Sequence, residues 1–86
     1  LDISEGRPIT ELDVNSTRNV AVIGKDIIVK IFPNTNPIGK KVTLQGQKYE
    51  VVGIIKERGA MLGRSQDNLM IIPLTSYMKY HSSLWE

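Results

Sequence analysis

The chain has 86 residues, of which 41% are hydrophobic, so it suits one small domain and is too apolar for a disordered tail. Its 11 basic and 9 acidic residues leave a net charge of +2, which is too balanced for the strongly basic face of a nucleic-acid-binding domain. The absence of cysteine excludes a disulfide scaffold and a cysteine-ligated metal site, and no apolar run approaches the roughly 18–20 residues of a membrane span.

The first two predicted elements are a short helix and a buried strand. Thr10 and Asp13 have the spacing of a capping box, which predicts a helix over residues 11–16. The apolar run over residues 20–23 is typical of a buried strand, and Gly24 ends it.

Residues 25–32, KDIIVKIF, give conflicting signals. Their β-branched residues favour a strand. Ile27 and Ile31 stand four positions apart, however, and Asp26 suits a helix N-terminus. We favour a short helix that stops before Pro33, with a strand as the alternative.

The stretch NPIGKKV, residues 36–42, resembles a phosphate-binding loop at first sight because it contains a Gly-Lys pair. Position 34 is Asn where that motif has its first glycine, no Ser or Thr follows the lysines, and a strand comes next. We therefore predict a turn made by Pro37 and Gly39, with Lys40 and Lys41 in solvent at the sheet edge.

A β-hairpin is predicted after this turn. Residues 41–45 alternate between apolar and polar, Gly46 marks the turn, and residues 48–56 form the return strand. Beyond Val51 that strand is apolar on both faces, and Gly53 in its middle indicates a bulge, a bend or a close backbone approach.

The last third of the chain contains a long connection, a strand and a helix. Residues 57–68 are mostly polar, residues 69–72 read as a buried strand closed by Pro73, and Thr75 is the expected cap of a helix through Tyr80. The element order predicts an α+β fold: a small, mainly antiparallel and partly barrel-like sheet of about four strands with short flanking helices.

No set of residues predicts catalysis, a cofactor or a metal. Four acidic residues could in principle form acid/base pairs: Asp13, Glu50, Glu57 and Asp67. For Glu50 we expect a cross-strand ion pair, and for Asp67 a hydrogen bond to its own backbone two positions on. His81 is the only histidine, so it has no second histidine with which to share a metal and no acid at a suggestive spacing.

The most promising recognition surface is the stretch GAMLGR, residues 59–64. Met61 and Leu62 stand between two glycines, and Arg64 follows. Methionine adapts to varied partners, so this stretch predicts a partner contact, although packing of the two apolar side chains back on the domain is an equal alternative.

A second functional hypothesis is a freestanding β-rich binding module for single-stranded nucleic acid. The predicted hairpin carries Lys40, Lys41 and Lys48, but its one aromatic, Tyr49, falls on the apolar face. Stacking on bases requires exposed aromatics along a basic groove, so the sequence gives this hypothesis little support.

Three longer stretches, taken in order, resemble a known family. They are EGRPITELDV (residues 5–14), the central block from VAVIG to GIIKE (residues 20–57), and GRSQDNLMIIPLTSY (residues 63–77). Together they resemble the periplasmic core domain of MacB-type ABC transporter permeases, a family that includes lipoprotein-release permeases. The Pro-Ile-Gly turn at Ile38 and the Val-Val-Gly strand at Val52 correspond to structural positions of that family.

The resemblance implies a fragment of a larger membrane protein. Residues 1–86 would form the smaller, inserted subdomain of the region outside the cytoplasm, consistent with a chain that starts without Met or a leader. The implied role is non-catalytic, since ATP is hydrolysed in a separate cytoplasmic domain. The implied partners are the rest of a dimeric permease and a periplasmic adaptor or a lipoprotein or peptide substrate, with no cofactor and no nucleic acid.

Overall fold

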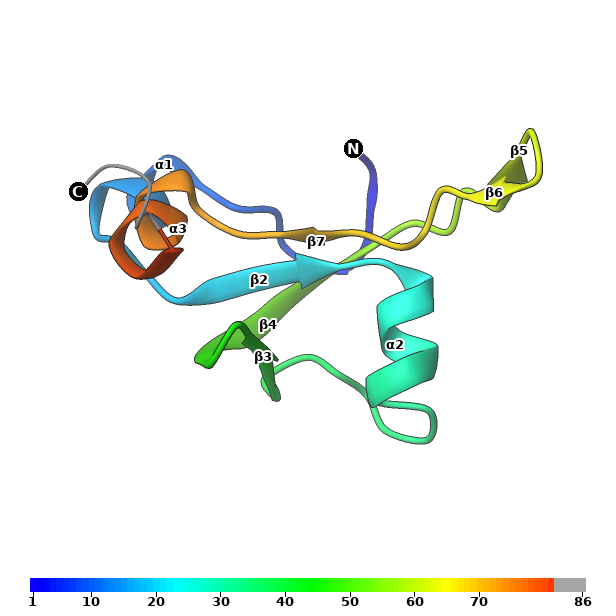
Figure 1. The fold of residues 1–86 in the computed structure, drawn as a ribbon, viewed down its shortest axis with the longest axis horizontal. Helices are drawn as coiled ribbons and strands as arrows, with labels where there is room; N and C mark the ends of the chain where they lie inside the picture. Colours follow the sequence, from blue (N-terminus) through cyan, green and yellow to red (C-terminus); the bar gives the residue numbers. More distant parts are fainter. Residues whose placement is uncertain (82–86) are drawn as a thin grey trace.

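The computed structural model describes residues 1–81 as a five-stranded sheet with three short helices and a separate hairpin (Figure 1). The sheet contains β1 (Ile3–Gly6), β2 (Val20–Ile23), β3 (Lys41–Leu44), β4 (Gln47–Ile55) and β7 (Met70–Ile71). The helices are α1 (Glu11–Asn15), α2 (Lys25–Ile31) and α3 (Leu74–His81), and the hairpin consists of β5 (Ala60–Met61) and β6 (Arg64–Ser65). The predicted α+β class is confirmed, and within residues 1–81 no helix is long and apolar enough to cross a membrane.

The sheet is organised around β4, its nine-residue strand. β3 pairs with the first half of β4 and β1 with the second half, both antiparallel and along the same edge. β2 runs parallel to β4 along the other edge, and β7 pairs antiparallel with β2. The sheet is therefore mainly antiparallel and open, with five strands instead of about four, because the polar-looking β1 carries no clear strand pattern in the sequence.

Two of the three roles predicted for Gly53 are confirmed: a bulge and a close backbone approach. The pairing of β2 with β4 skips Val52, so a bulge lies beside this glycine. A Cβ added at Gly53 would lie only 2.1 Å from the Arg7 carbonyl oxygen, so the chain that leaves β1 crosses directly over β4 here. Only glycine allows this close approach.

The hydrophobic core lies between the sheet and α2. Its buried members are Ala21, Ile23, Val42, Tyr49 and Val51. The partly buried residues of α2 and its C-terminal end that pack against this core are Ile27, Ile28 and Phe32. Their burial explains why helix prevails over β-propensity in residues 25–32, and α2 ends at Ile31, directly before Phe32 and Pro33.

Three predictions for the last third of the chain are wrong, and they concern the long connection, the cap of α3 and the burial of β7. The long connection contains the β5–β6 hairpin, whose two turn residues Leu62 and Gly63 both have positive φ (54° and 78°). Turns of this kind usually carry Asn-Gly, so leucine concealed the hairpin in the sequence. Thr75 is the second residue of α3 and not its cap, because Leu74 already belongs to the helix after Pro73. In addition, β7 is half-buried where a buried strand was expected.

Candidate functional site

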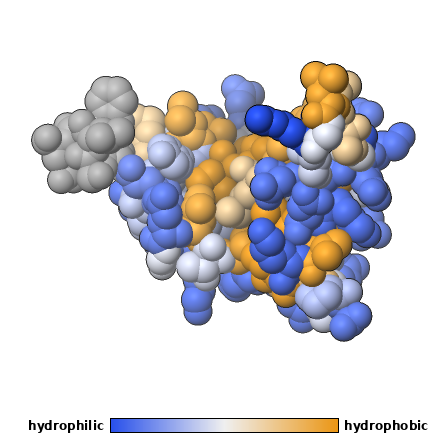
Figure 2. Space-filling model, turned by 45° about the vertical axis from the view of Figure 1, so that its right-hand side comes forward, coloured by the Kyte–Doolittle hydropathy of each residue, from blue (hydrophilic) through white to orange (hydrophobic). Residues whose placement is uncertain are grey.

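The β5–β6 hairpin projects from the end of the molecule farthest from α1 and α3 (Figure 1). Leu62 at its tip is 97% exposed, and Met61 beside it is 61% exposed. Arg64 pairs with Met61 across the hairpin and is also exposed. Figure 2 shows hydrophobic residues gathered at this projecting tip. The structure thus brings together the three residues singled out in the sequence: Met61, Leu62 and Arg64. The apolar side chains of Met61 and Leu62 are in solvent and do not pack back on the domain.

The backbone conformation at the hairpin tip is unfavourable for the residue that occupies it, Leu62. Leu62 adopts a left-handed conformation, which costs a residue with a Cβ roughly 1–2 kcal/mol relative to the right-handed region. Its side chain gains nothing in return from burial. Leu62 is thus both strained and exposed.

The root of the hairpin is held by the carboxylate of Asp67. This side chain is 4% exposed and accepts hydrogen bonds from the backbone N–H groups of Arg58 (2.8 Å) and Gly59 (2.9 Å). The backbone N–H of Gln66 donates to the Gly59 carbonyl oxygen at 2.9 Å and closes the root. The prediction that Asp67 bonds its own backbone two positions on is therefore wrong, since it bridges to the opposite strand of the hairpin root.

The same root is fixed to the sheet and to α2. The Asp67 carbonyl oxygen accepts from the backbone N–H of Asp26 at the start of α2 (3.2 Å), and the N–H of Gly24 donates to the Leu69 carbonyl oxygen (2.9 Å). A Cβ added at Gly24 would lie 2.3 Å from the Asp67 carbonyl oxygen, so the two segments touch without an intervening side chain. The hairpin therefore combines a root held by backbone hydrogen bonds with an exposed apolar tip.

A second buried carboxylate, Asp13, lies in α1 at the other end of the molecule. It accepts two hydrogen bonds from the Arg7 guanidinium, at 2.7 and 3.2 Å, and one from the backbone N–H of Thr10 at 2.9 Å. The predicted capping box is confirmed, because the Thr10 hydroxyl accepts from the Asp13 N–H while the Asp13 carboxylate accepts from the Thr10 backbone. The hydrogen bonds from Arg7 hold the pKa of Asp13 well below its usual range.

The four acidic candidates do not form an acid/base pair among themselves. Asp13 is ion-paired in α1, and Asp67 lies in the hairpin root. Glu50 lies 3.9 Å from the Lys41 ammonium, which confirms the predicted cross-strand ion pair. Within residues 1–81, no group of three or more His, Cys, Asp or Glu side chains is placed to hold a metal ion.

His81 has a structural partner that the sequence did not reveal. Its Nε2 lies 2.9 Å from the hydroxyl of Tyr49, a residue of the core whose pKa is raised by burial. A buried tyrosine needs a partner for its hydroxyl, and the prediction that Tyr49 faces the core was the available signal. The identity of that partner depends on α3 folding back over the sheet.

The NPIGKKV stretch forms the predicted turn. The Asn36 side-chain oxygen accepts from the Ile38 N–H at 3.0 Å, and the Lys40 N–H donates to the Pro37 carbonyl oxygen at 2.9 Å. Gly39 has φ +84°, and Lys41 is exposed at the start of β3. The stretch therefore shapes a turn, and its Ile38, Gly39 and Lys40 amides donate to acceptors of the protein itself.

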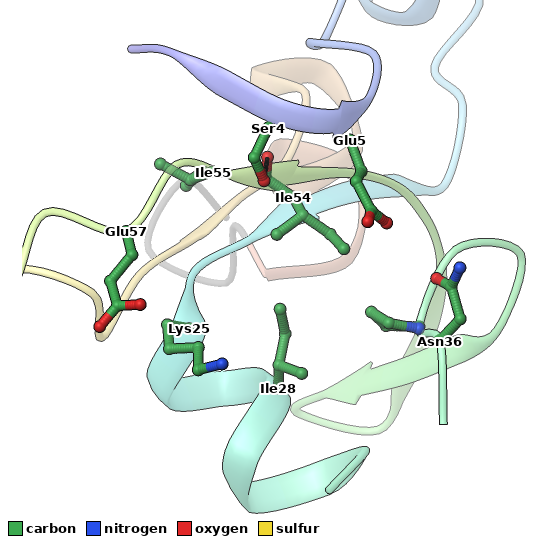
Figure 3. Close-up of a pocket in the computed structure, with 9 residues that line it drawn as sticks. Ser4, Glu5, Lys25, Ile28, Asn36, Ile54, Ile55 and Glu57 are labelled. Atoms are coloured by element: carbon green, nitrogen blue, oxygen red, sulfur yellow. Dashed lines mark hydrogen bonds between the residues drawn. The ribbon is translucent and has the colours of Figure 1, made fainter. Parts of the chain in front are cut away.

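An open recess of about 380 Å³ adjoins this turn (Figure 3). Isoleucines from α2 and β4 line it, and Glu5, Lys25 and Glu57 contribute charges of both signs. The Ser4 hydroxyl donates to the Ile54 carbonyl oxygen at 3.3 Å, so it is engaged with the backbone and not with an acid. The recess therefore presents no nucleophile paired with a base.

Comparisons with known proteins agree on one family. Residues 1–85 match the family described as the MacB-like periplasmic core domain. The chain is 35% identical over 79 residues to the macrolide export ATP-binding/permease protein MacB of Syntrophobacter fumaroxidans, covering 91% of this chain and 11% of that protein. It is 33% identical over 75 residues to the pyoverdine export protein PvdT of Pseudomonas aeruginosa, covering 86% of this chain and 11% of that protein.

Two solved structures share the fold. The extracellular domain of the transporter YknZ from Gram-positive bacteria superposes with a TM-score of 0.80 at 32% identity, covering 96% of this chain and 40% of that one. The periplasmic region of MacB from Actinobacillus actinomycetemcomitans superposes with a TM-score of 0.78 at 25% identity, covering 96% of this chain and 35% of that one. The chain thus spans only about 11% of the length of the first curated relatives.

Proposed function

Because this chain belongs to the family of MacB-like periplasmic core domains, we propose that it couples movement of permease membrane helices to a partner or substrate outside the cytoplasm. It is an extracytoplasmic part of a MacB-like ABC transporter permease. The proposed role is non-catalytic. The observation that carries it is the hairpin, in which a root fixed to β2 and α2 supports an exposed apolar tip.

Residues 1–86 are proposed to form a single subdomain, the smaller inserted part of a larger region. Support comes from the coverage of the solved structures, in which a module like this one accounts for 35% and 40% of the extracytoplasmic chain. The parent permease is proposed to be a dimer in the membrane, with its ATP-hydrolysing domain in the cytoplasm.

A module of this kind transmits movement only if it moves as one body. Near its first residues, β1 pairs with β4, and near its last described residues, α3 binds the C-terminal end of α1 and the connection that follows it. Displacement at either place is therefore passed through hydrogen bonds to the sheet and on to the hairpin root.

The hairpin tip is the proposed contact with the partner, through Met61, Leu62 and Arg64. A flexible thioether and an exposed leucine suit an apolar pocket, and the guanidinium suits a carboxylate at the rim of that pocket. The partner proposed to carry this surface is a periplasmic adaptor, a lipoprotein or a peptide. The nucleic-acid alternative has no supporting observation, because Tyr49 is buried in the core.

The contact is tested by replacing both apolar tip residues in the full-length permease. Met61→Ser with Leu62→Ser should leave the thermal midpoint nearly unchanged and reduce transport. Protection of cells against a macrolide is the first readout, since relatives carry that substrate in their names. A matched control is Val29→Ser with Ile31→Ser, a second pair of exposed apolar residues, in α2. Unchanged transport in the tip variant would reject the contact, and a large loss of stability would show that the tip is packed inside the permease.

Rigid-body coupling is tested with a cross-link inside the module. Glu5 and Ile54 are paired across β1 and β4, and the chain has no cysteine, so Glu5→Cys with Ile54→Cys should form a disulfide. Transport should persist in the oxidised form if the module moves as one body. Loss of transport on oxidation, with recovery on reduction, would mean that β1 separates from β4 during the cycle.

A further inference from the structure

Helix α3 is oriented with its polar side inward and its apolar side outward. Ser76 is completely buried, whereas Leu74 is 65% exposed and Tyr77 and Met78 are each 45% exposed. The spacing i, i+3 and i+4 places the three exposed residues on one face, opposite Ser76. A surface helix normally buries its apolar stripe, so this arrangement is the reverse of the usual one.

The inward side of α3 is attached by hydroxyl groups. The Ser76 hydroxyl donates to the Arg18 carbonyl oxygen and the Thr75 hydroxyl donates to the Val14 carbonyl oxygen, each at 2.6 Å. Both acceptors lie at or just after the C-terminal end of α1, where helix carbonyl groups lack partners within the helix. These two bonds dock the helix without the use of Leu74 or Met78, and the Tyr77 ring lies 5.2 Å from the His81 ring of the same helix.

We propose that the face formed by Leu74, Tyr77 and Met78, called here the α3 face, packs against another part of the extracytoplasmic region of the same permease chain. This proposal rests on the proposed function only in placing the chain within a larger permease. It concerns a different end of the molecule from the hairpin tip and does not depend on transport.

The coverage of the solved relatives favours this occupant. In both, a module like this one is a minor part of one extracytoplasmic chain, so most of that chain lies outside the module. Interfaces between parts of one chain typically bury about 600–1,500 Å², and an exposed apolar patch marks a surface that such an interface covers. The α3 face is a compact helical surface of this kind, whereas the hairpin tip is a narrow projection.

The chain segment before α3 lines an apolar cleft. Ile71 is three residues before Leu74, which limits their separation to about 11 Å. It lines an apolar cleft of about 210 Å³ together with Leu1, Ile3, Pro8, Ile9 and Val22. An apolar cleft therefore lies close in the chain to the α3 face.

Two other occupants fit less well. Three half-exposed side chains on an eight-residue helix offer less than the ~800 Å² per partner of a standard interface, so a second copy would need further contacts. Helices that lie on membranes usually present several cations beside their apolar face. The only lysine of α3, Lys79, instead lies 5.3 Å from the centre of the Tyr80 ring.

Cysteine labelling in the full-length permease tests whether the face is covered. Met78→Cys should react with a maleimide roughly tenfold more slowly in the folded permease than after denaturation, because the packed segment shields it. The matched control is Lys79→Cys, the exposed neighbour on another side of the same helix, which should react quickly in both states. Fast labelling of Met78→Cys in the folded permease would overturn the proposal.

A photo-reactive benzoylphenylalanine at position 78 identifies the occupant. The expected product is a cross-link within one chain, to a peptide outside residues 1–86. A cross-link between two chains, a lipid adduct, or no protein adduct would each overturn the proposal. Loss of transport in the tip variant with an intact intrachain cross-link supports both proposals, and either can fail while the other stands.

Discussion

The hairpin end and the α3 end of the molecule both hold polar groups inside and expose apolar ones. At the hairpin end, the buried carboxylate of Asp67 is satisfied by backbone N–H groups alone. At the α3 end, the buried carboxylate of Asp13 is paired with the charged guanidinium of Arg7. The hydrophobic core lies between them, so the exposed apolar residues of the two ends are additional to the core and are not needed to form it.

The difference between the ends lies in what their exposed residues can contact. The hairpin presents a two-residue tip on a narrow stalk, which suits insertion into a pocket. The α3 face presents one side of a helix, which suits packing against a flat element. The same chain thus has one end suited to a transient contact and another suited to a permanent one.

The largest effect is expected from Asp13→Ala at the α3 end. The change leaves the Arg7 guanidinium and the Thr10 N–H without their acceptor, and it removes the capping box of α1. Because Arg7 is partly in solvent, the loss should be about 2–4 kcal/mol, below that of a fully buried pair. Urea denaturation measures it, and the exposed Glu11→Ala in the same helix should change stability by less than about 0.5 kcal/mol. Equal losses for both variants would contradict the importance of the ion pair.

The second-largest effect is expected from low pH, which should destabilise the α3 end of the molecule. The pKa of Asp13 is well below its usual range in the folded protein and about 3.9 in the unfolded chain. A carboxyl group with a lowered folded pKa contributes stability that is complete above the unfolded value and is lost as pH falls through about 4 toward the folded value. Denaturation curves at a series of pH values from 6 to 2 should show this loss, and Asp13→Asn should reduce the slope below pH 4. An unchanged slope in that variant would assign the acid sensitivity to other carboxylates.

At the hairpin end, Asp67→Asn should have a smaller and more local effect. The amide keeps one acceptor oxygen but turns an NH₂ group toward the second backbone N–H, which costs about 1–3 kcal/mol. Hydrogen exchange should accelerate most at the Arg58 and Gly59 amides. Exchange in β4 should change much less, since the central strand does not depend on the hairpin root. Uniform acceleration across both regions would mean that the hairpin and the sheet unfold together.

The sequence predicted the middle of the molecule better than its ends. The β3–β4 hairpin, the α2 helix and the role of Gly53 follow from local patterns: alternation, apolar residues four positions apart, and a glycine within an apolar strand. The strand β1 was missed because its residues are mostly polar and it depends on β4 for its pairing partner. Its identity as a strand is therefore set by a tertiary contact and not by its own sequence.

In the candidate site, too, the sequence predicted what local patterns determine and missed what depends on contacts between distant residues. The exposed apolar tip was predicted as a stretch worth examining, but its hairpin was not, because Leu62 stands where turn chemistry favours Asn. Thr10, the capping-box partner of Asp13, is three positions away and was predicted, whereas Arg7 for Asp13, Arg58 for Asp67 and Tyr49 for His81 lie six to 32 positions away. No local pattern encodes the more distant pairings, so the sequence did not reveal them.

The smallest effect on stability, and the sharpest separation of the two ends, is expected from Leu62→Asn. Asparagine tolerates the left-handed backbone of the tip, so stability should rise by up to about 1 kcal/mol, or roughly 4–8 °C in the thermal midpoint of a domain of this size. Transport by the full-length permease should nevertheless fall, because the apolar contact is lost. Leu62→Gly should give a similar result, whereas Met61→Ser should reduce transport without the gain in stability. If the midpoint falls instead, Leu62 is packed in the assembled permease. At the α3 end, stability and transport should fall together in Leu74→Ser with Met78→Ser, since these changes would remove the apolar contacts proposed for the α3 face.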